Sequence, residues 1–255
     1  MSSAIRVEWW KLRRSTVTIS ATILMAVLLP AMALGLYSVA QNGGTGPLAE
    51  KASAFAVGEG WVGYLGVTDQ IAAVAIFLGA GVVVAWVFGR EHSDRTFPSL
   101  FALPVSRSTF AGAKFLVLLG WIVVLSSSVV VVAVGIGLLA GVGANDSGVI
   151  WSALLRLFVV ALTASTLALT MGLVASIGRG YLPAVGALIL IVAAAQVTVL
   201  FGTGGWFPFA VPGLIAIAGA DGAPELNLIQ IALVPMGTLA VAWLTVRWWQ
   251  HAQVV

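Results

Sequence analysis

Long apolar stretches separated by short polar segments dominate this chain. Six of the stretches are long enough to cross a bilayer, whose hydrocarbon core needs about 20 mostly apolar residues per helix. They cover residues 16–40, 69–89, 115–143, 151–177, 182–202 and 228–248. We therefore predict an all-α integral membrane protein of six transmembrane helices, in which residues 1–255 form a single transmembrane domain.

The composition supports this prediction, because 60% of the residues are hydrophobic and only 8% are charged. The chain has no cysteine, and its two histidines, His92 and His251, are far apart in sequence. A disulfide framework is therefore excluded and a metal site is disfavoured. No basic face with interleaved aromatic residues is present, so nucleic acid is not expected as a partner. The first apolar stretch reaches spanning length without a clear cleavage site, and we interpret it as a retained helix.

The distribution of Lys and Arg predicts the orientation, since cytoplasmic loops are enriched in these residues. With a cytoplasmic N-terminus, only Lys51 and Arg156 of the 12 basic residues fall on or near the outside. Both termini are then expected in the cytoplasm of a multi-pass cell-membrane protein. The basic residues assigned to the inside are Arg6, Lys11, Arg13, Arg14, Arg90, Arg95, Arg107, Lys114, Arg179 and Arg247.

The segment before the first span predicts an amphipathic elbow helix in the headgroup plane. Ile5, Trp9, Leu12 and Thr16 follow helical spacing, and the arginines lie on another side. A simpler interpretation is that the tryptophans belong to an interfacial aromatic belt, and the two interpretations overlap. The residues assigned to this membrane elbow are Trp9, Trp10, Arg13 and Arg14.

Two further patterns concern packing and the outer surface. Gly137 and Gly141 form a GxxxG step, and small residues recur at 164, 168 and 172, which permits close helix contact within one bundle or at a subunit interface. We favour packing within one bundle. Between the last two spans, Pro208 and Pro212 interrupt an apolar segment that is too short to span, so it is expected to be interfacial or re-entrant.

The spans carry little of the chemistry that gradient-driven transport or intramembrane catalysis requires. No acid or histidine lies near the middle of a span, and Asp69 lies at the outer end of the second. Arg156, near the outer end of the fourth, is either a candidate substrate-pathway residue or an interfacial anchor that snorkels. The serines at 126–128 have no neighbouring base, and no phosphate-binding loop of the type GxxxxGK[ST] is present.

Between the second and third spans lies the segment "REHSDRTFPSLFALPVSRSTFAGAK", residues 90–114. Thr96 can cap a helix of about two turns that accepts Pro98 in its first turn and is stopped by Pro104. This helix is too short to span and too apolar to be free in solution, so it should lie on the membrane or dock into a partner. Ser106 can then cap the third span.

This segment resembles the cytoplasmic coupling segment of ABC-2 type permeases, the membrane subunits of ATP-binding cassette exporters. The resemblance rests on an acid after the second span, a threonine, a short hydrophobic helix, "LPVSR" and Lys114, although Arg95 stands where many members have glycine. Within the family it is most similar to antibiotic and bacteriocin efflux or immunity permeases. The resemblance assigns ATPase coupling to Glu91, Arg95, Thr96, Phe97, Leu100, Phe101, Leu103, Pro104 and Arg107.

The resemblance implies a permease subunit that moves an amphipathic substrate, such as a drug, an antibiotic peptide or a lipid-like molecule, out of the cell. It implies two copies of a separate ATPase that binds ATP and magnesium, and a second permease, identical or homologous. The chain itself would hold no cofactor and would not be an enzyme. The alternatives are a membrane scaffold or sensor without transport, and a lipid-modifying intramembrane enzyme.

Overall fold

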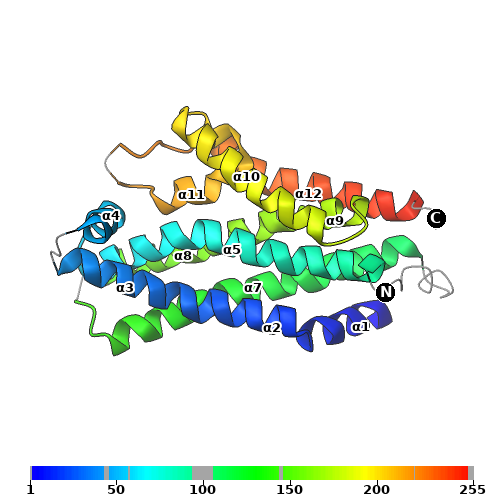
Figure 1. Cartoon of the computed structure of the whole chain (residues 1–255), viewed down its shortest axis with the longest axis horizontal. Helices are drawn as coiled ribbons and strands as arrows, with labels where there is room; N and C mark the ends of the chain where they lie inside the picture. Colours follow the sequence, from blue (N-terminus) through cyan, green and yellow to red (C-terminus); the bar gives the residue numbers. More distant parts are fainter. Residues whose placement is uncertain are drawn as a thin grey trace.

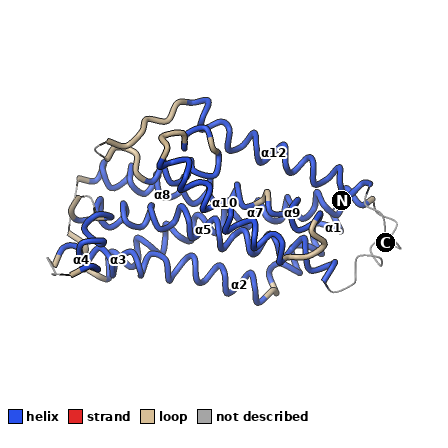
Figure 2. Tube along the Cα trace, turned by 45° about the horizontal axis from the view of Figure 1, so that its top comes forward, coloured by secondary structure: helices blue, strands red, loops and turns tan. Residues whose placement is uncertain are grey.

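Six helical units of the described chain are long and apolar enough to cross a membrane, which confirms the predicted all-α membrane fold. They lie side by side with their axes close to one direction, as an elongated bundle (Figure 1). No strand occurs among the residues that the structure describes (Figure 2). The six units are Thr16–Gln41, Gly60–Glu91, Arg107–Leu139, Ser147–Ile177, Leu182–Leu200 and Leu228–His251.

The computed structural model describes residues 2–42, 46–56, 58–93, 106–143, 146–220 and 222–251. Helix α1 precedes the first span, which consists of α2, a π-helical turn η1 and α3, and the fourth span consists of α8 and α9. The remaining spans are α5, α7, α10 and α12. The bounds are α1 Ser2–Arg13, α2 Thr16–Ile23, η1 Leu24–Leu28, α3 Leu29–Gln41, α4 Pro47–Phe55, α5 Gly60–Ser93, α7 Arg107–Leu139, α8 Ser147–Ala168, α9 Met171–Ile177, α10 Leu182–Leu200, α11 Val211–Ala216 and α12 Leu228–His251.

Two of the helices extend well beyond the stretches that hydropathy marks. Helix α5 begins at Gly60 and α7 begins at Arg107, whereas the pattern predicted spans from 69 and 115. At 1.5 Å per residue, the 34 residues of α5 reach about 51 Å, against roughly 30 Å for a hydrocarbon core. The polar start of α7 and the polar C-terminal end of α5 continue these helices beyond their apolar stretches. Residues 60–68 of α5 are mostly apolar and were left out of the predicted span, which began at Asp69.

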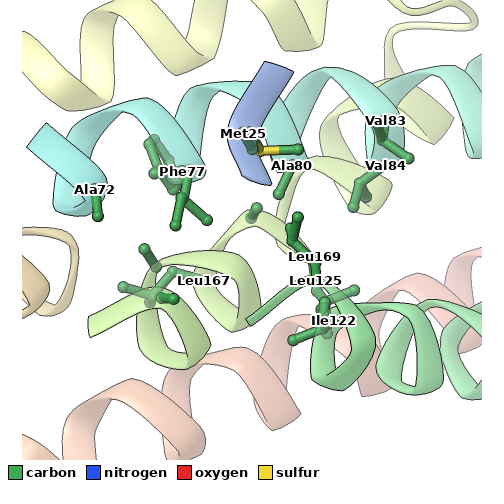
Figure 3. Close-up of a cluster of buried hydrophobic side chains, with 14 of the residues drawn as sticks. Met25, Ala72, Phe77, Ala80, Val83, Val84, Ile122, Leu125, Leu167 and Leu169 are labelled. Atoms are coloured by element: carbon green, nitrogen blue, oxygen red, sulfur yellow. The ribbon is translucent and has the colours of Figure 1, made fainter. Parts of the chain in front are cut away.

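Helices α5 and α8 form the centre of the bundle, and the contact between them is more extensive than that between any other two described elements. Buried apolar side chains from η1, α5, α7 and α8 meet between them (Figure 3). Phe77, Val84, Leu125 and Leu167 are among the residues of this core. Spans α10 and α12 are the least buried, so most of their apolar surface faces outward.

The small residues of the third and fourth spans pack inside the bundle. A Cβ at Gly137 would lie 2.5 Å from the Trp61 ring, and one at Gly172 would lie 2.9 Å from the Phe88 ring. Ala164 and Ala168 are fully buried. These close approaches favour the intramolecular interpretation at Gly137 and in the fourth span. Gly141 does not share it, because it is exposed beyond the end of α7 and a Cβ there would have nothing within 4 Å.

The two ends of the bundle differ in charge. Helix α1, the C-terminal ends of α5 and α12 and the N-terminal end of α7 share one end, which we call the basic end (Figure 1). The other end, with α4 and the start of α8, is the opposite end. The turn after α9 also reaches the basic end, because Gly89 lies against Gly180 and Tyr181. The described basic residues at the basic end are Arg6, Lys11, Arg13, Arg14, Arg90, Arg107, Lys114, Arg179 and Arg247.

At the opposite end, the proline-interrupted segment folds back onto the bundle. It forms two 3₁₀ turns, Gly204–Trp206 and Pro208–Ala210, followed directly by α11. Helix α11 packs on α8 and α5, and its Val211 and Leu214 are buried. The burial of this short helix against α5 and α8 is compatible with both the interfacial and the re-entrant interpretation.

Candidate functional site

A buried cluster of charged side chains joins three helices at the basic end. Lys114 of α7 donates to Glu91 of α5 at 2.8 Å, to Glu8 of α1 at 3.0 Å, and to the carbonyl oxygen of Val87 at 3.2 Å. The Lys114 side chain is 0% exposed, and the two glutamates are 3% and 5% exposed. All three donors of the ammonium group are therefore used, and we call this group the ion cluster.

Two further cations surround the ion cluster. Lys11 lies 3.1 Å from Glu8 and 3.6 Å from Glu91, and Arg90 lies 3.7 Å from Glu8. The Arg90 guanidinium also stacks over the ring of Trp86, with its Cζ atom 4.4 Å from the ring centroid. The two carboxylates are thus held by three cations from α1, α5 and α7, which makes the contact between α1 and the bundle electrostatic as well as apolar.

The surroundings of Glu8 hold its carboxyl group in the charged form. Burial alone would raise the pKa of Glu8, but the attraction of Lys114 and Lys11, with their hydrogen bonds, outweighs burial and lowers the pKa below its ordinary value of 4.5. Glu8 is therefore ionised at neutral pH. An ionised carboxylate in this position holds α1 against α5 and α7.

Helix α1 packs on the bundle through one face and leaves another exposed. Ala4, Glu8 and Leu12 are buried, whereas Trp9 is 41% exposed and Trp10 is 57% exposed. The ion pairs of Glu8 turn that residue toward the bundle, and the exposed tryptophans leave the elbow in the headgroup plane as a prediction. The two tryptophans stay on the surface of the elbow, where Arg14 stacks over Trp10 with its Cζ atom 3.6 Å from the ring centroid.

A second ion pair lies toward the opposite end. Arg156 of α8 donates through Nε to Asp69 of α5 at 2.7 Å and through one terminal nitrogen to the carbonyl oxygen of Ala218 at 3.1 Å. Asp69 is fully buried and the Arg156 side chain is 26% exposed. Arg156 thus connects α5 and α8 to the chain that follows α11. The sequence had left open that Arg156 is an interfacial anchor that snorkels, and the structure shows it in an ion pair with Asp69.

Two adjoining cavities surround this second pair. One, of about 350 Å³, lies between α5 and α10 under α11. Its lining is mostly apolar and includes the polar side chain of Gln196. The other, of about 360 Å³, is lined by Arg156 and by the chain after α11. Phe55, Gln70 and Ile217 line both cavities, and Gln70 donates to the carbonyl oxygen of Phe55 at 2.9 Å. Two mostly apolar cavities therefore adjoin each other, and the Arg156 side chain lines one of them.

The spacing of the two charged groups along α5 relates them to a membrane. Asp69 and Glu91 are 22 residues apart on one helix, which corresponds to about 33 Å. This distance is close to the thickness of a hydrocarbon core, roughly 30 Å. The ion cluster and the Asp69–Arg156 pair therefore lie near the two boundaries of the apolar part of the bundle.

Comparison with protein families gives the chain its class. The sequence matches the family described as ABC-2 family transporter protein over residues 4–196, which is most of the chain. The chain belongs to the ABC-2 transporter family. No curated protein matches it by sequence. The match extends from α1 into α10, so the ion cluster, Asp69 and Arg156 all lie within the family region of this ABC-2 permease.

Membership makes the chain the membrane component of a transporter and implies association with an ABC ATPase. Of the residues assigned to ATPase coupling, Glu91 lies in the ion cluster and Arg107 is the first residue of α7. Ser106 caps α7 as predicted, since its hydroxyl oxygen accepts from the backbone N–H of Thr109. The coupling residues Arg95, Thr96, Phe97, Leu100, Phe101, Leu103 and Pro104 lie outside the described residues.

Sequence reasoning missed the partnership of Glu8 with Lys114 and the burial of Asp69. For Lys114 and Asp69 the available signal was a charge among apolar neighbours, where an unpaired charge is costly. Glu8 gave no such signal, because α1 also carries Arg6, Lys11 and Arg13. The sequence could not identify the partners, because they are 106 residues apart for Lys114 and Glu8 and 87 residues apart for Arg156 and Asp69. Within the described residues, no group of three or more metal-ligating side chains is positioned to hold a metal ion.

Proposed function

We propose that this ABC-2 permease is the transmembrane subunit of an ATP-driven exporter that moves an amphipathic substrate out of the cell. The observation that carries the proposal is the ion cluster. Glu91 lies two residues before the end of α5, and Lys114 lies seven residues after the start of α7. A movement of the segment between these helices is therefore transmitted to α1, α5 and α7 together.

Energy is supplied by a separate chain in this proposal. The sequence has no phosphate-binding loop, and its short hydrophobic segment at 97–103 has the character of a docking element. Two ATPase subunits engage two permeases, identical or homologous, from the cytoplasmic side, and the basic end is that side. The excess of basic residues at this end, with both termini, supports the orientation.

The two cavities support an amphipathic substrate. The cavity between α5 and α10 accepts an apolar body, and the adjoining cavity presents Arg156 to a polar group. Arg156 keeps this role in the substrate pathway while it is paired with Asp69, because a guanidinium group has five N–H donors and two of them account for the contacts with Asp69 and Ala218.

The test is copurification. The tagged chain is solubilised from native membranes and its partners are identified by mass spectrometry, and the ATPase activity of the chain alone is compared with that of the complex. We expect an ABC ATPase with a second permease, and no hydrolysis by the isolated chain. Isolation without any ATPase would favour a scaffold or sensor, and hydrolysis by the isolated chain after removal of contaminating ATPases would contradict the proposal.

A further inference from the structure

A groove lies in the angle between α1 and the first span. It has a volume of about 240 Å³ and is lined by residues of α1, α2 and α7. The lining residues are Trp9, Leu12, Arg13, Thr18, Ile19, Thr22, Ile23 and Trp121. Most of these side chains are apolar, and we call this site the elbow groove.

Local structure explains why the elbow groove forms. Helix α1 ends at Arg13, and Ser15 caps α2 by accepting from the backbone N–H of Thr18 at 3.2 Å. The chain therefore bends between the two helices. Trp121 of α7 forms part of the lining, where its indole N–H donates to the hydroxyl oxygen of Thr22 at 3.0 Å and fixes that side chain.

One buried polar atom in the wall of the elbow groove lacks a partner. The Thr18 side chain is 4% exposed, and its hydroxyl oxygen has no hydrogen-bond partner among the described residues. The hydroxyl of the neighbouring Thr22 instead donates to the carbonyl oxygen of Thr18 at 2.7 Å. A buried hydroxyl without a partner costs free energy, so an acceptor supplied by a bound molecule would remove that cost.

The charge at the mouth of the elbow groove is positive and not neutralised by an ion pair. Arg13 is exposed, lines the groove and forms no ion pair with any residue that the structure describes. The one acid of α1, Glu8, is engaged by Lys114 and Lys11 on the buried face of the helix. Arg13 is therefore available to an anion, and a guanidinium group binds phosphate oxygens in a bidentate manner.

We propose that the elbow groove is a binding site for one anionic phospholipid. Arg13 binds the phosphate, the Thr18 hydroxyl donates to an ester carbonyl, and the acyl chain lies on Ile19 and Ile23. These residues follow one another from the bend into the span, in the order in which a phospholipid presents the same groups from its headgroup to its tail. The exposed Trp9 lies beside the headgroup, where indole rings are favoured.

The proposal is independent of the transport function and is tested on the purified chain. Native mass spectrometry in detergent measures binding from an equimolar mixture of phosphatidylglycerol and phosphatidylcholine with the same acyl chains. We expect a preference for phosphatidylglycerol at one site. Arg13→Gln should reduce this preference about fivefold, which is the effect of one basic residue near an anionic surface. Arg6→Gln is the matched control, because Arg6 is exposed on the same helix and does not line the groove.

A second variant separates the headgroup from the glycerol contact. Thr18→Val keeps the shape of the side chain and removes its hydroxyl. Because phosphatidylglycerol and phosphatidylcholine both have the ester carbonyl, the retention of both lipids should fall to a similar degree. Equal effects of Arg6→Gln and Arg13→Gln would mean diffuse attraction and no site. The absence of a preference in the wild-type chain, or unchanged lipid retention in Thr18→Val, would also overturn the proposal. Circular dichroism checks that each variant is folded.

Discussion

Lys114 is the residue on which the arrangement of the basic end depends most directly. Its ammonium group lies between two carboxylates that belong to helices far apart in sequence, and its side chain has no contact with solvent. Each charge in this group is tolerated because the others are present, since an isolated charge in such surroundings would be strongly destabilising. The consequence is that single substitutions and combined substitutions should behave very differently.

We expect Lys114→Met to lower the free energy of unfolding by about 3 to 5 kcal/mol, because it leaves two buried carboxylates near each other. Lys51→Met is the matched control, since Lys51 is exposed on α4, and should stay within about 0.5 kcal/mol of the wild type. Replacing the whole group, Glu8→Gln with Glu91→Gln and Lys114→Met, should recover most of the loss. Thermal denaturation in detergent measures the stability of Lys114→Met, Lys51→Met and the triple variant. Equal stability of Lys114→Met and Lys51→Met would contradict a structural role for the cluster.

The lowered pKa of Glu8 predicts how the docking of α1 depends on pH. The folded state has the lower pKa, so the stabilisation from Glu8 is fully present above its ordinary pKa of 4.5 and is lost as the pH falls through the lower folded value. The wild-type chain should therefore be unaffected between pH 7 and 5 and lose stability below 4.5. Hydrogen exchange of α1, measured against pH, tests this, and Glu8→Gln should show no such transition.

The Asp69–Arg156 pair predicts unequal effects of its two substitutions. Arg156→Gln leaves a fully buried carboxylate unpaired and should cost about 3 to 5 kcal/mol, whereas Asp69→Asn leaves a cation that is 26% exposed and should cost less. The double variant should resemble Asp69→Asn. A thermal shift for each variant decides the point, and an unchanged Arg156→Gln protein would mean that the stability of the fold does not depend on this pair.

At the scale of elements, the sequence predicted the number of spans and the cap of α7, because apolar length and a capping serine act locally. It did not predict the full length of α5, because the predicted span began at Asp69 and left out residues 60–68, which are mostly apolar and continue the helix. It also did not identify the face through which α1 packs on the bundle. That face is determined by Lys114, on a different helix, and no local spacing contains this information.

The placement of the helix ends predicts a topology that single cysteines can test, because the chain has none of its own. Ser108 lies at the start of α7 at the basic end, and Ser147 lies at the start of α8 at the opposite end. An impermeant thiol reagent applied to intact cells should label Ser147→Cys, and should label Ser108→Cys only after permeabilisation. The reverse pattern would place the basic end outside and contradict the orientation proposed from the charge distribution.

At the scale of the whole molecule, the described spans place their buried ion pairs at two levels along the bundle. The ion cluster joins the three helices at the basic end, and the Asp69–Arg156 pair holds the chain that follows α11 at the other level. Between these two levels, the described spans carry apolar and uncharged polar side chains. The family makes the chain the membrane component of a transporter and implies association with an ABC ATPase.

The decisive prediction for the whole molecule concerns the segment between α5 and α7. If its apolar side chains fit a groove on the ATPase, each buried Leu or Phe contributes about 1.5 to 3 kcal/mol. The double variant Leu100→Asp with Phe101→Asp should then weaken ATPase binding about 100-fold to 10,000-fold, while the ion cluster keeps the bundle folded. Leu138→Asp with Leu139→Asp is the matched control, because these exposed residues end α7 at the opposite end. Titration of the solubilised variants with the ATPase measures both affinities. Unchanged affinity of the Leu100 and Phe101 variant would identify the segment as a surface helix that rests on lipid headgroups, and the transmission of ATP hydrolysis would then have to enter the bundle elsewhere.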